Sequence, residues 1–375
     1  MWIMEDKNQM KLFIKKIKNK ELILVISAII LTIISFLIRI IVSPISIDTE
    51  SFLVDSKGII QSWESVNRVS LCFLKRIFLS LNLVTINILA VIILIVSYFI
   101  LAKYVLTKLK KANFTNYVLF ILIILTSLAT IESYAFTLQI LEISICYFLM
   151  IVSFLLIDKI IYYKKYLYLI VVVPFIAFTL NAYQSFYLME ITLSCLLYIL
   201  NYKEDKRVVT IFKYIIILIM AIVVSNFLLK GYLNFYHINP NSVDNGYLLE
   251  QINYRTSIKK GIFYLGATVI YTCFGKNVVN ISYLITVIIG IWYLRHKQEF
   301  LYRLSFLFLL ISPFLMSIFL GNYTFMRSQF SAPIITAFVF LKFIDIKKIR
   351  KLVFFQLFYQ IMLVMLLFSY DNVRY

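Results

Sequence analysis

The stretch that decides the fold is LVTINILAVIILIVSYFILA, which runs from Leu83 to Ala102. It contains no charged residue, and a helix needs about 20 apolar residues to cross the hydrocarbon core of a bilayer. Similar apolar runs recur along the chain and are separated by short, often lysine-rich segments. A membrane β-barrel would instead show alternating strands of about ten residues. The pattern therefore predicts an all-α, polytopic membrane protein.

The composition of the whole chain supports this class. Of the 375 residues, 62% are hydrophobic and the mean hydropathy is +0.92, whereas soluble domains are about half apolar. We attribute the net charge of +19 to basic residues that hold loops in the cytoplasm, and we expect no binding to nucleic acid. The four cysteines form no C-x-x-C pair and the two histidines lie far apart, so we expect no metal, disulfide framework or cofactor.

The apolar runs predict about eleven transmembrane helices, with lysine clusters at their cytoplasmic ends. Residues 1–21 are expected to form an amphipathic segment on the inner leaflet. No small-residue cleavage site follows the first apolar run, so we interpret that run as a retained helix rather than a signal peptide. The predicted helices cover residues 22–43, 83–106, 116–131, 135–157, 166–180, 184–200, 208–229, 278–294, 301–320, 327–342 and 352–369.

This arrangement predicts one membrane-embedded domain over residues 1–375, with the N-terminus in the cytoplasm and the C-terminus outside the cell membrane. Most of the 37 lysines and arginines then lie inside, as orientation in membranes requires. Tight outer turns are expected at Glu132-Ser133-Tyr134 and at residues 181–184. A long outer loop covers residues 230–277. Within it, residues 261–275 are expected to form a re-entrant or surface helix, because if they span the membrane every later helix inverts.

The first outer loop, residues 44–82, is expected to carry two interfacial helices. One is a short surface helix over residues 51–62. The other covers residues 66–81 and is amphipathic, so it is expected to lie in the plane of the interface. Its apolar face is predicted to carry Val66, Phe73, Leu74, Ile77, Phe78 and Leu81. Its polar face is predicted to carry Arg68, Lys75 and Arg76.

Acidic residues supply the candidates for catalysis. Asp48 and Glu50 follow Pro44 on a short loop above the bilayer, where a carboxylate can act as general base on a sugar hydroxyl. The alternatives are a solvated loop or a pair of metal ligands. Glu142 and Glu190 lie deeper, one to two turns inside their helices. Ionisable groups at that depth are costly and mark a site or pathway, unless they bond to neighbouring helices.

Basic and aromatic residues on the same outer side are candidates for substrate binding. Arg327 is expected to clamp a phosphate, and the alternative is an interfacial anchor. Arg68 has the same two interpretations and a third, an ion pair with Glu64. Trp63 is expected either to lie in the interfacial belt of aromatic residues or to stack on a sugar ring. The remaining candidates are Glu132, Tyr183, Gln184, Arg255 and Asn322.

Four short motifs carry a resemblance to a known family. They are the loop from Pro44 to Asp48-Thr49-Glu50 with Trp63 and Arg68 beyond it, Asn181-Ala182-Tyr183-Gln184-Ser185, Phe325-Met326-Arg327-Ser328-Gln329-Phe330, and Tyr370-Asp371-Asn372-Val373-Arg374-Tyr375. Together they resemble the type II glucosyl transferases of the O-antigen-modifying Gtr group. Members of that group usually continue past the last motif, so either a truncated form or a dispensable outer C-terminal part is expected here.

The resemblance implies a GT-C-like fold and a hexosyltransferase that uses a polyprenyl-phosphate sugar, with glucose the expected hexose. It implies transfer to a cell-surface glycan, such as O-antigen or teichoic acid, on the outer face of the cytoplasmic membrane. It also implies that Asp48 is the base, with Glu50 in support. A phosphate leaving group held by arginines is expected to need no metal.

Two other functions stay open. A flippase or transporter for lipid-linked glycans would have charged residues in a two-sided cavity and broken helices at the midplane, whereas the polar residues here are predicted to gather at one face. A polysaccharide polymerase or ligase would rely on arginines in residues 230–260, where only Arg255 occurs.

Overall fold

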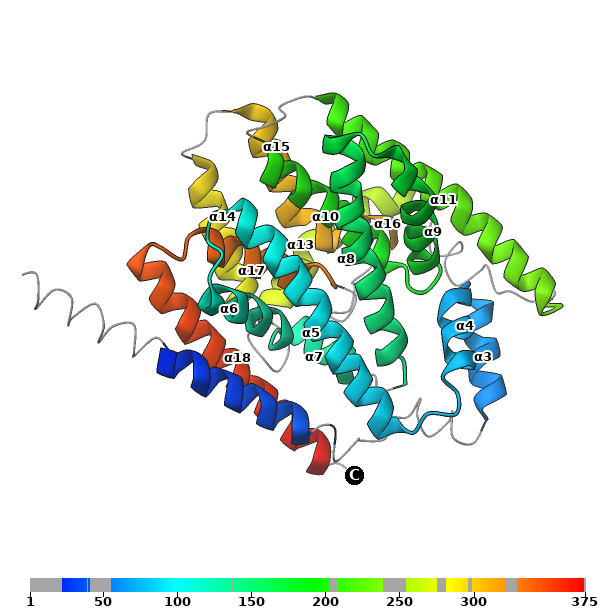
Figure 1. The fold of residues 1–375 in the computed structure, drawn as a ribbon, viewed down its shortest axis with the longest axis horizontal. Helices are drawn as coiled ribbons and strands as arrows, with labels where there is room; N and C mark the ends of the chain where they lie inside the picture. Colours follow the sequence, from blue (N-terminus) through cyan, green and yellow to red (C-terminus); the bar gives the residue numbers. More distant parts are fainter. Residues whose placement is uncertain are drawn as a thin grey trace, which may run out of the picture.

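The chain folds into a bundle of helices (Figure 1). A computed structural model describes residues 22–38, 40, 55–135, 138–202, 208–238, 254–274, 281–295, 299–320 and 329–373. Within these ranges every regular element is a helix and none is a strand. The predicted all-α class is therefore confirmed for the part of the chain that the structure describes.

Several helices are long and apolar enough to cross a membrane. Four meet this condition alone, and α6 (Phe114–Leu125) and α7 (Leu128–Ala135) make a fifth if this pair, bent by 59°, is one span. The four are α5 (Leu83–Lys108), α8 (Ile140–Tyr163), α11 (Val208–Phe235) and α18 (Lys347–Val373). These helices agree with a multi-pass membrane protein, whereas eleven spans and a GT-C-like fold remain predictions.

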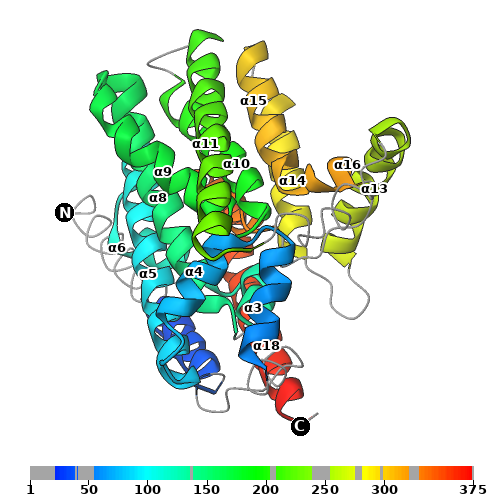
Figure 2. The same cartoon turned by 90° about the vertical axis from the view of Figure 1, so that its right-hand side faces the viewer.

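Shorter apolar helices complete the bundle. They include Leu22–Ile38, α9 (Leu169–Leu180) after the 3-10 turn η1 (Tyr166–Tyr168), α10 (Ser185–Asn201), α14 (Ile281–Arg295), α15 (Phe300–Ile311) and α17 (Ala332–Lys342). Helix α5 packs on α8, α8 on α9, and α9 on α11, while α10 lies against α8, α9, α11 and α15. In Figure 2 most of these rods run roughly upright, and α10 is seen between α11 and α15.

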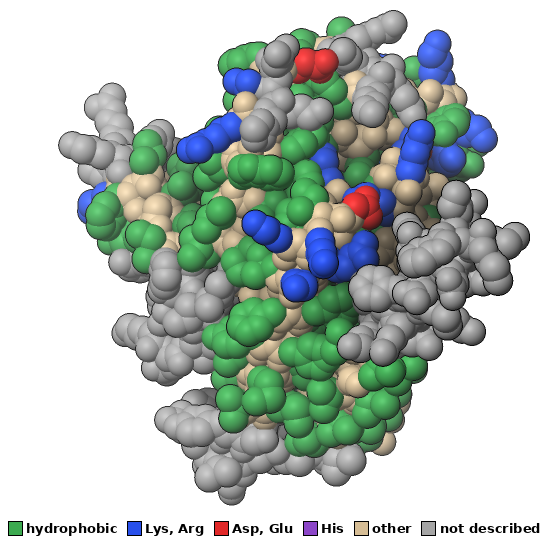
Figure 3. Space-filling model, turned by 90° about the vertical axis from the view of Figure 1, so that its left-hand side faces the viewer, with side chains coloured by type: hydrophobic (Ala, Val, Ile, Leu, Met, Phe, Trp, Pro, Cys, Tyr) green, Lys and Arg blue, Asp and Glu red, His purple; other side chains and the backbone are tan. Residues whose placement is uncertain are grey.

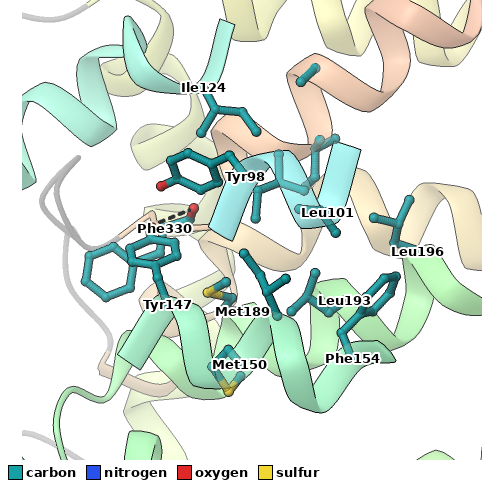
Figure 4. Close-up of a cluster of buried hydrophobic side chains, with 14 of the residues drawn as sticks. Tyr98, Leu101, Ile124, Tyr147, Met150, Phe154, Met189, Leu193, Leu196 and Phe330 are labelled. Carbon is teal, nitrogen blue, oxygen red and sulfur yellow. Dashed lines mark hydrogen bonds between the residues drawn. The ribbon is translucent and has the colours of Figure 1, made fainter. Parts of the chain in front are cut away.

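The core is a continuous cluster of apolar and aromatic side chains in the centre of the bundle. Figure 4 shows part of it, where Tyr98 of α5, Tyr147 of α8 and Met189 of α10 converge. The Tyr147 hydroxyl donates a hydrogen bond to the carbonyl oxygen of Phe330 at 3.1 Å. Because this bond satisfies two polar groups inside an apolar core, it fixes the chain just before α17.

The lysine-rich junctions between helices come together at one end of the bundle. Lys111 Nζ lies 2.7 Å from Asp345 Oδ2 and donates to the carbonyl oxygen of Lys342. Lys108 Nζ donates to Asn201 Oδ1 at 2.5 Å. Figure 3 shows basic side chains in the upper and middle part of one face, above an almost entirely apolar lower part. We call this end the basic end, and the opposite end the α4 end after the helix α4 (Val69–Ile77) that lies there.

Two predicted helix boundaries differ because of proline. The helix predicted over residues 327–342 begins at Ala332, where Pro333 occupies the first turn, a position that proline favours. The helix predicted over residues 301–320 is interrupted by the 3-10 turn η3 (Ser312–Phe314), which contains Pro313. The helices in these two regions are therefore shorter than predicted.

The turn predicted at Glu132-Ser133-Tyr134 is wrong. These residues lie inside α7, and the chain bends earlier, at Thr126 and Ser127 between α6 and α7. The segment that follows the bend contains leucine, alanine and glutamate and neither glycine nor proline, so it continues as helix. Glu132 is half-buried in this helix.

The apolar segment predicted over residues 261–275 belongs to α13 (Tyr254–Phe274). This helix packs on α16 (Met316–Leu320), and both lie at the side of the bundle in Figure 2. A Cβ atom at Gly261 would lie 2.5 Å from the carbonyl oxygen of Ile318, so only glycine permits this approach. Whether α13 crosses the membrane stays a prediction.

Candidate functional site at the α4 end

Two short helices form the candidate site, close to where the sequence predicts interfacial helices. Helix α3 (Ser56–Ser65) begins after Asp55, whose Oδ1 accepts a hydrogen bond from the backbone N–H of Gly58 at 2.9 Å, which caps the helix. The chain then turns at Asn67, whose φ of 62° is left-handed, a conformation that asparagine tolerates. Helix α4 follows at once.

The predicted polar face of α4 is wrong at Lys75. This side chain is 2% exposed, and its Nζ lies 2.8 Å from Glu142 Oε1 of α8 and donates to the carbonyl oxygen of Leu138. Phe73 and Ile77, predicted on the apolar face, are exposed on the surface of the bundle. Helix α4 turns its lysine inward because Glu142 would otherwise be a buried carboxylate without a counter-ion, which costs several kcal/mol, typically about 3–5 when one partner is removed.

A second ion pair joins α4 to α3 and α11. Arg76 Nη2 lies 2.8 Å from Glu64 Oε1, and the Tyr232 hydroxyl donates to the same oxygen at 2.7 Å. Burial acts to lower the pKa of Arg76, but its hydrogen bonds to Glu64 and Tyr232 outweigh burial and raise that pKa. Glu64 is therefore paired with Arg76, and the predicted alternative of a pair with Arg68 is not what the structure shows.

Arg68 remains available for another partner. Its guanidinium carbon lies 4.4 Å from the centroid of the Tyr183 ring, a cation–π contact. Its buried Nε has no hydrogen-bond partner among the residues that the structure describes. The Tyr183 ring packs on Phe330 with ring centroids 5.5 Å apart. Arg68 is thus held by the Tyr183 ring and keeps one donor without a partner among the described residues.

The predicted turn at residues 181–184 is confirmed between α9 and α10, and it holds α4 in place. The carbonyl oxygen of Asn181 accepts a hydrogen bond from the backbone N–H of Ser70 at 3.2 Å. The Asn181 side chain donates to the carbonyl oxygen of Ser225 and accepts from the Ser225 hydroxyl, each at 2.8 Å. Asn181 therefore links α4 to α11, and Gln184 beside it is half-buried.

The structure brings some of the predicted site residues together and says nothing of others. Arg68 and Tyr183 are in contact, and Trp63 lies in the adjacent core with 7% of its surface exposed, so its ring is covered. Arg255 lies in α13, but its side chain is not described. Asp48, Glu50, Asn322 and Arg327 lie outside the described ranges.

No metal site is evident in the part of the chain that is described. Among those residues, no three His, Cys, Asp or Glu side chains gather closely enough to hold an ion. The expectation that the protein binds no metal stays a prediction, because the acidic pair Asp48 and Glu50 is not included.

Sequence reasoning missed a buried carboxylate at the basic end, where it predicted only lysines. Asp158 is 2% exposed, and its Oδ1 accepts hydrogen bonds from the Tyr104 hydroxyl at 2.7 Å and from Asn201 Nδ2 at 3.3 Å. The sequence signal that could have identified this buried group is an aspartate about one helical turn before the end of an apolar run. A polar partner on another helix is the usual requirement for such a residue.

Polar side chains also lie inside the bundle, and the prediction that the candidate site residues gather at one face stays a prediction. Thr192 of α10 is bonded to the hydroxyls of Ser312 and Ser331, at 2.7 and 2.9 Å. Thr126 of α6 donates to Gln360 of α18 at 3.2 Å. Hydroxyl and amide groups of this kind join helices in membrane proteins.

Comparison of the chain with models of protein families, with curated proteins and with solved structures finds no match. The function therefore has to be argued from the residues of this chain.

Proposed function

We propose that the protein is a membrane hexosyltransferase that acts at the α4 end, on the extracytoplasmic side. The donor is a polyprenyl-phosphate hexose, with glucose as the first candidate, and the acceptor is a hydroxyl of a cell-surface glycan. The observation that carries the proposal is Arg68, whose guanidinium rests on Tyr183 and keeps a buried donor without a partner among the described residues. An arginine fork of this kind suits a phosphate.

Chain connectivity supports a second arginine nearby. Phe330 packs on Tyr183, and Arg327 precedes Phe330 by three residues, a stretch that spans at most about 11 Å. Arg327 can therefore reach the same phosphate as Arg68. Asp48 precedes Asp55, the cap of α3, by seven residues, or at most about 25 Å, and the proposal puts this base at the same end of the molecule.

The proposed reaction is a single inverting displacement. Asp48 takes the proton from the acceptor hydroxyl, with Glu50 in support, and the hydroxyl oxygen attacks the anomeric carbon. The bond from that carbon to the phosphate oxygen breaks, and the lipid phosphate leaves with the electron pair. Arg68 and Arg327 stabilise its charge. General-base catalysis typically contributes about 10²–10⁴-fold, and stabilising charge in the transition state contributes about 10²–10³-fold for each group.

The test is hexose transfer by purified protein in lipid, supplied with a labelled polyprenyl-phosphate hexose and a glycan acceptor. Asp48→Asn is expected to lower kcat by about 10²–10⁴-fold, because the amide cannot take the proton. The matched control is Asp55→Asn, since asparagine also caps helices well and Asp55 has no role in the reaction. Transfer by Asp48→Asn at the wild-type rate would remove the proposed base.

Arginine variants in the same assay separate binding from folding. Arg68→Gln is expected to raise KM for the donor, since it removes a phosphate contact. Arg76→Gln is the control, because Arg76 is already engaged by Glu64. Equal effects of the two changes on KM would count against a phosphate at Arg68.

A second candidate is a flippase for lipid-linked glycans. It is favoured by the buried polar and acidic groups inside the bundle, such as Glu190 and Asp158, and by the helix break at η3, since transporters often contain broken helices. Fluorescent lipid-linked glycan in proteoliposomes distinguishes the two, because the flippase moves the lipid between leaflets without cleaving the sugar from it.

A further inference from the structure

One buried carboxyl group takes no part in the proposed reaction. Glu190 lies in α10 and is 2% exposed. Its Oε1 accepts a hydrogen bond from the Ser194 hydroxyl, one turn further along the same helix, at 3.4 Å. Its buried Oε2 has no hydrogen-bond partner among the residues that the structure describes. Glu190 is therefore a buried acid held by one weak contact.

The helices packed against α10 bring no counter-ion to this carboxyl. Burial and the contact with Ser194 are the influences that act on it. The acidic groups of α8 are engaged elsewhere, Glu142 by Lys75 and Asp158 by Tyr104. The other charged and titratable side chains on α10 and on the helices around it are the following. Helix α5 carries Tyr98, Lys103, Tyr104 and Lys108, and α8 carries Glu142, Cys146, Tyr147, Asp158, Lys159, Tyr162 and Tyr163. Helix α11 carries Lys213, Tyr214, Lys230 and Tyr232, α15 carries Tyr302 and Arg303, and α10 itself carries Tyr187, Cys195 and Tyr198. Helix α9 and the turn η3 carry none.

This environment decides the charge on Glu190. Burying an ionised carboxylate without a cation costs far more than burying a neutral acid, which loses only part of its hydrogen bonding. Neither a lysine nor an arginine of the described residues compensates it. The neutral form, with a proton on the carboxyl, is therefore the one that this site holds.

The carboxyl is buried but close to a less buried strip of its own helix. Gln184, Tyr187, Ile191 and Ser194 are each half-buried and recur at helical spacing along α10. The strip begins at the turn beside Arg68, and six residues of helix separate Gln184 from Glu190, about 9 Å of rise. Glu190 therefore lies beside this strip, within about two helical turns of the α4 end.

We propose that Glu190 and Ser194 form a proton-binding site inside the bundle that exchanges with the α4 end along this strip. When the proton leaves, it passes to water on the strip, and the resulting carboxylate keeps the hydrogen bond from Ser194. Metal cations such as Ca²⁺ or Mg²⁺ need about six oxygen ligands, whereas the carboxyl here contacts one other side-chain oxygen in the described part of the chain. The inference does not depend on the proposed transfer reaction.

Dicyclohexylcarbodiimide tests this site, because it is an apolar reagent that reacts with protonated carboxyl groups inside membranes. Wild-type protein in lipid is treated at several pH values, and the adducts are mapped by peptide mass spectrometry. Glu190 is expected to be modified several-fold more than Glu142, because Glu142 has a cation 2.8 Å away and an opposite charge favours the ionised form. Glu142 is the internal control, since it has Lys75 as a counter-ion 2.8 Å away. The extent of modification at Glu190 is expected to fall as the pH rises, because the protonated fraction of the carboxyl falls.

Three results would overturn the proposal. The first is the absence of an adduct on Glu190, and the second is equal modification of Glu190 and Glu142. The third is protection of Glu190 by Na⁺ but not by choline at constant pH, because that result would assign the site to a metal cation. The mapping uses wild-type protein, so it does not depend on the folding of a variant. Glu190→Asp keeps the carboxyl and is expected to retain the adduct, whereas Glu190→Gln is expected to lose it.

Discussion

Glu142 and Glu190 are both buried carboxyl groups in adjacent helices, yet their surroundings differ. Glu142 meets Lys75, which comes from α4, a helix outside the candidate spans. Glu190 has a serine of its own helix and no cation among the described residues. Burial is therefore common to the two acids, and the counter-ion is what distinguishes them. The charge depends on whether another segment of the chain delivers a counter-ion.

The region around α4 and the region around Glu190 also differ in the kind of ligand that each can bind. Helix α4 carries Arg68, Lys75 and Arg76, and two of these three are paired with carboxylates. The region around α4 is thus left with an excess of positive charge at Arg68, which favours an anion such as a phosphate. The region around Glu190 offers a neutral acid and suits a proton.

The largest expected effect comes from breaking the pair at Glu142. Lys75→Met leaves a buried carboxylate without its cation, and we expect the free energy of unfolding to fall by about 3–5 kcal/mol. The measurement is unfolding in detergent, followed by heat or denaturant. The double change Lys75→Met with Glu142→Gln removes both charges and is expected to recover most of the loss. Wild-type stability in Lys75→Met would show that the pair contributes nothing.

A smaller effect is expected at Glu190. Glu190→Gln replaces a neutral acid by an amide of nearly the same size that can still accept from Ser194, so we expect a change below about 1 kcal/mol. Glu142→Gln is the matched control and is expected to cost more, because it removes the carboxylate that pairs with the buried Lys75. If Glu190→Gln lost as much stability as Glu142→Gln, Glu190 would be an ionised and paired group, and the contrast between the two acids would fail.

The sequence was sufficient for the features that depend on a single segment. Apolar runs predict the helices, lysine clusters predict which helix ends gather at the basic end, and the polar residues 181–184 predict the turn between α9 and α10. Each of these depends on local composition and on the cost of placing charge in a membrane. Proline at positions 313 and 333 also carried local information that explains where two helices break or begin.

The features that could not be predicted depend on two distant segments. Lysine is a residue type expected on a solvated face, and the burial of Lys75 is explained only by its contact with Glu142 of α8. In the same way, Tyr232 of α11 joins Arg76 at Glu64, which leaves Arg68 for Tyr183. A helical wheel of α4 contains neither partner, so it assigns Lys75 to the wrong face.

The central claim is that the α4 end faces the outside of the cell and the basic end faces the cytoplasm. The most direct measurement labels single cysteines with a membrane-impermeant maleimide on intact cells, after the four native cysteines have been replaced. Lys57→Cys on α3 and Tyr166→Cys in η1 place the cysteine at exposed positions of the two ends. We expect Lys57→Cys to be labelled on intact cells and Tyr166→Cys only after the cells are permeabilised. The reverse pattern would contradict the account.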